Sequence, residues 1–171
     1  MTTTTDLRTV LDITAAAVAQ DPSAAVVTFA ADSDLVGVTE VDVRIGDRVV
    51  KVDEPEALGG TGLAPNPVEL ALASIGSCQA ITYRFWSEKL GIRIDRLHVE
   101  VRGNLDIHGV FGLKDGVRPG FRDVEVSVQI SGSESPGRYE DLRSAVNEHC
   151  PVLDIFANPI PVVTSMRVQP A

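Results

Sequence analysis

The chain of 171 residues has few positive charges, few cysteines and no long apolar run. Its 15 lysines and arginines are outnumbered by 24 aspartates and glutamates, which gives a net charge of -9. Nucleic acids and anionic lipids are bound by basic surfaces, so this composition argues against both kinds of partner. No uncharged stretch is long enough for a membrane helix. Residues 1–17, MTTTTDLRTVLDITAAA, lack the basic start and apolar core of a secretory signal.

Cysteine occurs only twice, as Cys78 and Cys150, which is too few for a disulfide-stapled scaffold. We therefore expect a cytosolic, reducing environment, in which each thiol is either buried and inert or chemically active. Spacings such as C-x-x-C or H-x-x-x-H do not occur, so we expect no metal site. The GGTG of residues 59–62 lacks the spacing of a nucleotide-binding loop, and we expect no cofactor.

The hydrophobic pattern predicts an α+β fold with a largely antiparallel sheet. Alternating or β-branched stretches predict strands, and apolar residues at helical spacing predict helices. The expected strands are residues 25–30, 38–45, 48–52, 96–103, 121–130 and 161–168. The expected helices are residues 6–20, 67–90, 138–150 and a short one that begins at Pro151. We read residues 1–171 as one domain with an N-terminal extension, 1–22; its order is three strands, a long helix, two strands, two helices and a strand.

The predicted helix of residues 67–90 is apolar or small on nearly all sides in its first half, which is typical of a buried helix. Asn66 and Gly91 suit its two caps. Gly76 in its middle costs roughly 1 kcal/mol relative to alanine. We therefore expect close packing at Gly76, for example against the same helix of a second subunit. Cys78 lies on the apolar stripe of this helix, where its simplest role is that of a small buried hydrophobe.

Cys150 adds a second interpretation. It lies on the apolar face of its own helix and directly before Pro151, where free backbone N–H groups and the helix dipole can lower a thiol pKa. If the two thiols meet, a peroxide can oxidise one to a sulfenic acid, and the other can condense with it to a disulfide. An external dithiol then reduces the pair by exchange. The sequence leaves open whether they meet.

The histidines offer a different chemistry. His149 beside Cys150 could form a Cys–His pair for a hydrolase. Adjacent helix residues point about 100° apart, however, so an interaction of His149 with the last carbonyls of its helix is the simpler role. We expect His98, on a strand, and His108, in a loop, to face solvent.

Two further groups have structural and functional interpretations. The acidic cluster between the third strand and the glycine-rich loop is expected to form a solvated face, although its position beside the loop leaves a contribution to a site open; it consists of Asp53, Glu54 and Glu56. The aromatic residues of the long helix suit core packing or the wall of an apolar pocket; they are Tyr83, Phe85 and Trp86.

Three features together resemble the OsmC and organic hydroperoxide resistance (Ohr) family: the loop GGTGLAPNP (59–67), the helix with its central cysteine, and EHCPV (148–152). The resemblance runs from about residue 25 to the end. It implies an intertwined homodimer, with both central helices buried between sheets and two sites at the subunit interface. It also implies that Cys78 attacks organic or inorganic hydroperoxides, that Cys150 resolves the product, and that an external dithiol, such as a lipoylated protein, is the reductant.

The sequence departs from the peroxidase members of this family at two places. They carry Glu directly after the Asn-Pro, where this chain has Val68 followed by Glu69. They also carry an Arg in the early strands, where this chain has Asp34 and Leu35. Arg44, on the polar face of the next strand, could replace it, but an exposed arginine is the simpler interpretation. Without a nearby cation we expect a raised pKa of Cys78. These two departures favour the broader OsmC-like branch of the family. Within that branch, we expect a thiol-dependent hydroperoxide reductase. The alternative is a non-catalytic dimer that binds a small hydrophobic molecule at its interface.

Overall fold

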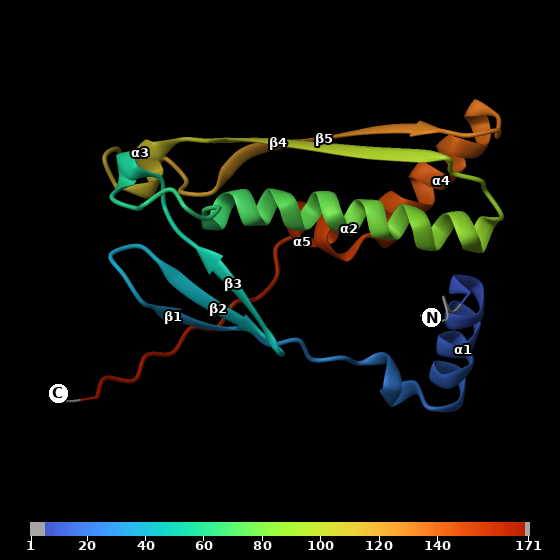
Figure 1. Cartoon of the computed structure of the whole chain (residues 1–171), viewed down its shortest axis with the longest axis horizontal. Coiled ribbons are helices and arrows are strands. Elements are labelled where there is room, and N and C mark those ends of the chain that lie inside the picture. Colours follow the sequence, from blue (N-terminus) through green and yellow to red (C-terminus); the bar gives the residue numbers. More distant parts are fainter. Residues whose placement is uncertain (1–5, 170–171) are drawn as a thin grey trace.

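A computed structural model describes residues 6–169. Figure 1 shows a long helix in the middle of the molecule, with a two-stranded sheet on one side of it and a three-stranded sheet on the other. The helix is α2 (Pro67–Leu90), and the strands are β1 (Asp32–Leu35), β2 (Val41–Ile45), β3 (Arg48–Val52), β4 (Arg96–Leu105) and β5 (Phe121–Ser131). The remaining helices are α1 (Leu7–Gln20), α3 (Ile107–Val110), α4 (Pro136–His149) and α5 (Pro151–Ala157).

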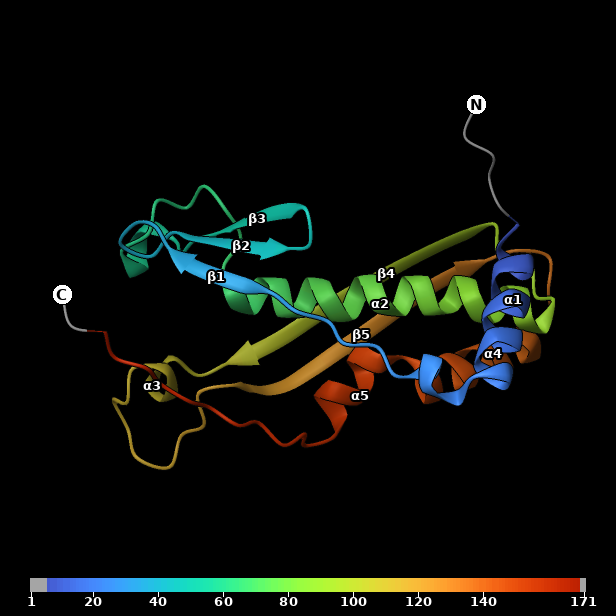
Figure 2. The same cartoon turned by 90° about the horizontal axis from the view of Figure 1, so that it is seen from below.

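The α+β class and the antiparallel pairing are confirmed. β1 pairs with β2, β2 with β3 and β4 with β5, all antiparallel. The turn between β2 and β3 contains Gly46 with φ of 57°, a left-handed conformation that glycine adopts without strain. Helices α4 and α5 run alongside α2, and α1 lies near the C-terminal end of α2 (Figures 1 and 2).

Two predicted strands are wrong. Residue 25 ends a short 3-10 helix (Pro22–Ala25), and residues 26–30 have no regular structure. Strand β1 begins only at Asp32. Residues 161–168 contain no strand either. Both segments have the composition of strands, but a strand needs a neighbouring strand, and neither segment has one among residues 6–169. Their side chains are left uncovered, with Phe29 91% and Val163 94% exposed.

The long helix begins and ends where the sequence predicted. The side-chain oxygen of Asn66 accepts a hydrogen bond from the backbone of Glu69, 2.8 Å, and the Glu69 carboxylate accepts one from the backbone of Asn66, 2.9 Å. This reciprocal capping box satisfies two N–H groups that a helix start otherwise leaves unpaired. Gly91 ends the helix in the left-handed conformation, with φ of 61°.

The core lies where the C-terminal half of α2 meets α4 and the β4–β5 sheet. Its fully buried cluster consists of Tyr83, Ile92, Leu142 and Val146. The close packing expected at Gly76 exists, but its partner is β4 of the same chain: a Cβ on Gly76 would lie 3.2 Å from Cγ2 of Val101. Glycine thus lets α2 approach the sheet, and no second helix is needed for this contact.

Much of the apolar surface has no cover. The accessible surface is 13018 Å², whereas a folded monomer of 18.2 kDa has roughly 8,100 Å². The first half of α2, expected to be buried on nearly all sides, is exposed in the single chain at Ala73, Ser74 and Ser77. In its second half, Ile81 and Phe85 are 54% and 41% exposed. Among residues 6–169, no helix is both long and apolar enough to cross a membrane.

The N-terminal extension is helical over most of its length, as α1 shows. Its first five residues lie outside the described part of the chain. The guanidinium of Arg8 donates to the carbonyl of Glu88, 3.0 Å, which joins α1 to the last turn of α2. The reading of the whole chain as one domain stays a prediction.

Candidate functional site

Two thiols from distant parts of the chain meet between α2, α4 and α5. Cys78 lies in the middle of α2, and Cys150 lies between the end of α4 and the start of α5. Their sulfur atoms are 3.5 Å apart, although the residues are 72 positions apart in the sequence. Both cysteines are free thiols. The structure therefore brings together the two residues that the sequence singled out.

The junction at Cys150 follows from Pro151. Proline disfavours a helical conformation of the residue before it, and Cys150 is extended, with φ of -84° and ψ of 109°. Helix α4 therefore ends at His149, and α5 starts anew with proline in its first turn, where no N–H is needed. The backbone N–H of Val152, in that first turn, favours the thiolate form of Cys78 and so acts to lower the pKa of this thiol.

The two thiols differ in exposure. Cys150 is buried, with 1% of its surface exposed, whereas Cys78 is partly exposed. A reagent that enters from solvent thus reaches Cys78 first, and Cys150 lies behind it.

Burial raises the pKa of the Cys78 thiol, and the neighbouring Cys150 adds to this rise. The N–H of Val152 and the side chain of Thr82 act in the opposite direction, without cancelling the rise. The sequence predicted that free N–H groups at a helix start lower the pKa of Cys150. In the structure, the N–H of Val152 acts on the pKa of Cys78 instead. No positively charged group contributes, as the missing arginine led us to expect.

A loop of buried hydrogen bonds precedes α2. The Asp53 carboxylate is 2% exposed and accepts hydrogen bonds from the Thr39 hydroxyl, 2.6 Å, and from the Thr61 N–H and hydroxyl, 2.7 and 2.6 Å. These bonds hold the pKa of Asp53 far below its usual range. The expectation that Asp53 belongs to a solvated face is therefore wrong, because the loop folds over it; Glu54 and Glu56 do reach solvent.

Gly60 allows this loop to close. A Cβ there would lie 1.7 Å from the carbonyl oxygen of Glu54, so only glycine fits. The backbone N–H of Asp53 also donates to the carbonyl of Pro65, 3.2 Å, one residue before the N-cap of α2. The loop thereby fixes the start of the helix that carries Cys78.

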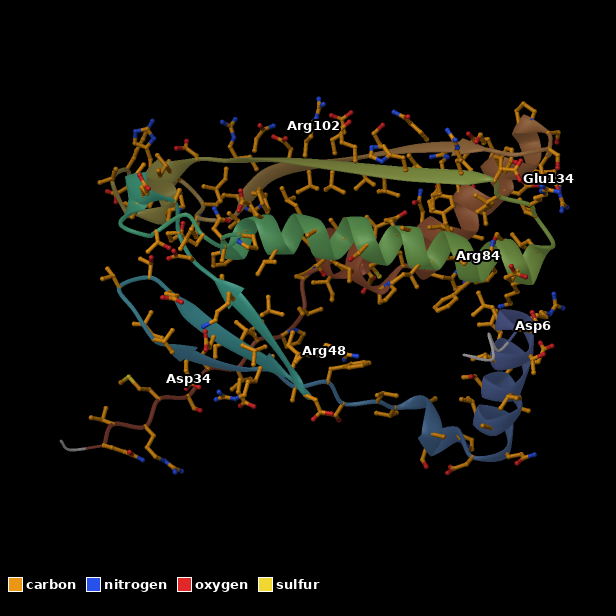
Figure 3. All side chains as sticks on the ribbon, viewed as in Figure 1. Asp6, Asp34, Arg48, Arg84, Arg102 and Glu134 are labelled. Atoms are coloured by element: carbon orange, nitrogen blue, oxygen red, sulfur yellow. The ribbon has the colours of Figure 1, made fainter. Side chains whose placement is uncertain are left out.

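The charged residues considered as replacements for the family's Glu and Arg have other partners. Glu69 is held in the capping box of α2. Arg44 forms an ion pair with Asp34. Figure 3 shows Asp34 on the β1–β3 sheet, away from α2. Val68, at the position of the family's Glu, is 39% exposed. Within the single chain, neither charge reaches the thiols.

His149 does not pair with a thiol. Its Nδ1 lies 2.8 Å from the carbonyl oxygen of Ala145, the helix-end interaction that the sequence favoured. Its ring packs on Trp86, with centroids 4.2 Å apart. His98 is exposed, as expected. His108 is exposed but lies in the short helix α3, with Nδ1 2.8 Å from the carboxylate of Asp106.

The aromatic residues of α2 divide between two roles. Tyr83 and Trp86 belong to the core, and Phe85 is 41% exposed. The sequence did not reveal the contribution of Val152, because it is a backbone contact between distant segments. Thr82 could have been noticed, since it lies four residues after Cys78 on the same helix face. Within residues 6–169, no three His, Cys, Asp or Glu side chains are grouped so as to hold a metal ion.

Comparisons with known proteins identify the family and the fold. Residues 60–165, more than half of the chain, match the sequence profile described as OsmC, OsmC-like protein. No curated protein matches the chain. The OsmC-like protein from Mycoplasma pneumoniae has a similar structure, with a TM-score of 0.67, 16% identity, and coverage of 77% of this chain and 88% of that protein.

Two further structures have the same fold. The organic hydroperoxide resistance protein OsmC from Legionella pneumophila has a TM-score of 0.57 and 22% identity, over 75% of this chain and 88% of that protein. An organic hydroperoxide resistance protein from Elizabethkingia anophelis has a TM-score of 0.59 and 20% identity, over 75% and 87%. The profile match, with the fold and the paired cysteines, shows that the chain belongs to the OsmC family.

Proposed function

We propose that the protein is a cytosolic, homodimeric thiol peroxidase, in which Cys78 attacks a hydroperoxide and Cys150 resolves the product. The observation that carries this proposal is the 3.5 Å separation of the two sulfur atoms. A disulfide has an S–S distance of about 2.05 Å, so a shift of about 1.5 Å forms the bond. The partial exposure of Cys78 and the burial of Cys150 support the order of their roles.

The reaction balances in three steps. The Cys78 thiolate attacks one peroxide oxygen, the O–O bond breaks, and the leaving alkoxide takes a proton, which gives an alcohol and a Cys78 sulfenic acid. The Cys150 thiol then attacks the Cys78 sulfur and releases water as the disulfide forms. An external dithiol reduces this disulfide by two exchange steps and becomes a disulfide itself. We assign the reductant to the class of lipoylated proteins.

An alkyl hydroperoxide is the substrate class that we favour. The proteins from Legionella pneumophila and Elizabethkingia anophelis are organic hydroperoxide resistance proteins, and this chain shares their fold. Apolar side chains near the thiols, such as Ile75 one turn before Cys78 and Leu153 after Val152, suit an alkyl group better than a small polar peroxide.

The uncovered surface supports the dimer. Each chain exceeds the area of a compact monomer by roughly 4,900 Å². Obligate dimer interfaces bury roughly 2,000–5,000 Å² or more, counted over both partners, so covering only part of this excess on each chain would suffice for one. The outer edges of β1, β3, β4 and β5 have no neighbouring strand in the described chain, and such edges pair readily with another chain.

Intact-mass spectrometry tests the redox proposal. The reduced protein, mixed with one equivalent of cumene hydroperoxide, should lose two hydrogens in wild type within minutes. Cys78→Ser should keep its mass, because Cys150 alone is shielded. Cys150→Ser should gain one oxygen, which dimedone traps as a sulfenic acid. Oxidation of Cys78→Ser at the wild-type rate, or no disulfide in wild type, would overturn the assignment.

A further inference from the structure

A pocket of about 320 Å³ lies between α2, α4 and β5. Its polar lining comes from Gln79 and Tyr83 on α2 and from Arg143 and Asn147 on α4. Three valines of β5 form its apolar wall: Val124, Val126 and Val128. The thiol chemistry proposed above uses none of these side chains.

Two of the polar side chains are buried and have no protein partner. Gln79 and Tyr83 are each 2% exposed, and neither the amide nor the hydroxyl forms a hydrogen bond with another described residue. Within residues 6–169, no side-chain nitrogen or oxygen is both sealed from solvent and unpaired. The polar atoms of Gln79 and Tyr83 therefore reach open space, and the space that both residues line is this pocket. Water can satisfy these atoms in the free protein, and a ligand with its own polar group can replace that water in the pocket.

The hydrogen-bond donors around the pocket indicate which charge the polar group of the ligand carries. Tyr83, Gln79 and Asn147 can each donate a hydrogen bond, and the Arg143 guanidinium can only donate. Arg143 and Asn147 are four residues apart on α4 and share one face. The Nε and one terminal nitrogen of Arg143 both contact the same oxygen of Glu140, at 2.8 and 2.7 Å, which leaves the other terminal nitrogen free. A carboxylate accepts from all four side chains.

The pocket continues into an apolar channel. A second hollow of about 480 Å³ shares Val124, Val126 and Leu153 with the first. Its other apolar side chains include Ile75, Phe121 and Phe156. The two hollows therefore form one groove along β5, with polar donors at the Tyr83 end. Arg118, Arg122 and Asp123 lie at the opposite end.

We propose that this groove binds an amphipathic carboxylate whose hydrocarbon chain lies along β5. The carboxylate is held at the α2–α4 end, by Gln79, Tyr83, Arg143 and Asn147. The groove includes Ile75 and Leu153, which we propose above to contact the alkyl group of the hydroperoxide, so the two ligands share part of one surface. A carboxylate needs no O–O bond, however, so its binding can be measured without peroxide and without either thiol.

Isothermal titration calorimetry of the reduced protein with octanoate, 1-octanol and octylamine tests this proposal. Octanoate should bind at least ~10-fold more tightly than the other two, because charge-assisted hydrogen bonds contribute about 1.5–3 kcal/mol. Arg143→Gln should weaken octanoate binding ~10-fold or more and leave 1-octanol binding unchanged. The matched change at the other end of the groove, Arg122→Gln, should leave both unchanged.

Tyr83→Phe keeps the shape of the core and removes one donor, and it should weaken octanoate binding several-fold. Its thermal unfolding midpoint, measured beside that of Arg143→Gln, shows that the variants are folded. Equal binding of octanoate and 1-octanol, no binding of octanoate, or a loss caused by Arg122→Gln in place of Arg143→Gln would each overturn the proposal.

Discussion

The indole ring of Trp86 lies against the imidazole ring of His149, with ring centroids 4.2 Å apart. The ammonium group of Lys89 lies 4.1 Å from the same indole centroid. His149 directly precedes Cys150, so a movement of Cys150 toward Cys78 changes the surroundings of the only tryptophan in the protein. This ring pair therefore couples a spectroscopic probe to the state of the two thiols.

Formation of the disulfide should change the fluorescence of Trp86. The sulfur atoms have to approach by about 1.5 Å to form the bond, and the His149 ring moves with the backbone of Cys150. We expect a shift in intensity or emission maximum when one equivalent of hydroperoxide is added, and its reversal by a dithiol. Cys78→Ser should show no change. Identical spectra for reduced and fully disulfide-bonded protein, with the state verified by mass, would show that the junction does not move.

The reaction of Cys78 with electrophiles should increase with pH beyond the range of an ordinary thiol. Burial raises the pKa of Cys78, and only the thiolate is a nucleophile. The rate of alkylation by iodoacetamide, followed at Cys78 by peptide mass spectrometry, should therefore still climb above pH 9. The same cysteine in denaturant is the control, and its rate should level off at lower pH. A folded-state midpoint below that of the denatured control would contradict the burial argument.

The sequence was sufficient to predict elements whose determinants are local. The capping residues Asn66 and Gly91 fixed the bounds of α2, and the proline at 151 fixed the junction between α4 and α5. Residues 25–30 and 161–168 have strand composition, but they lack a partner strand in this chain. Their conformation depends on what lies beside them, which a local pattern does not contain.

The candidate site shows the same division. The residue pattern singled out both thiols, the family resemblance implied their separate roles, and the structure supplied their 3.5 Å separation. Asp53 was misread because its burial depends on Thr39 and Thr61, which belong to separate loops. The unpaired polar groups of Gln79 and Tyr83 also escaped notice, since their isolation is visible only once α4 and β5 are placed around them.

Gly60→Ala should destabilise the protein by more than about 2 kcal/mol, in the range of strongly disruptive single substitutions. The added methyl would lie 1.7 Å from the Glu54 carbonyl oxygen, and a backbone atom cannot move aside cheaply. Gly137→Ala is the matched control, because nothing lies within 4 Å of its Cβ position. The Gly137→Ala variant should have the same free energy of unfolding as wild type or one higher by about 0.5–1 kcal/mol, since alanine favours the helix. Equal unfolding midpoints for the two variants in urea would show that the loop is not closed.

The ionised Asp53 should stabilise the protein in full only above the pH at which a free aspartate ionises, and progressively less below it. Its hydrogen bonds with Thr39 and Thr61 lower its pKa in the folded state, so the folded state holds the ionised form more strongly than the unfolded state does. This contribution is complete above about pH 5 and is lost as the pH falls below about 4. The difference in unfolding midpoint between wild type and Asp53→Asn should therefore shrink from pH 6 to pH 3. A difference that stays constant over this range would show that the Asp53 charge is not responsible.

The protein should be a dimer of twice 18.2 kDa by light scattering, with an unfolding temperature that rises with protein concentration. Phe29 and Val163 are 91% and 94% exposed in the single chain, and at a truly exposed position a substitution changes stability by no more than about 0.5 kcal/mol. If a partner covers them, Phe29→Asp and Val163→Asp should dissociate the dimer, because each buries an unpaired charge. Phe29→Leu and Val163→Ile keep the surface apolar, so the protein should remain dimeric. A wild-type mass of one chain, or aspartate variants as dimeric and as stable as wild type, would mean that no partner covers these segments.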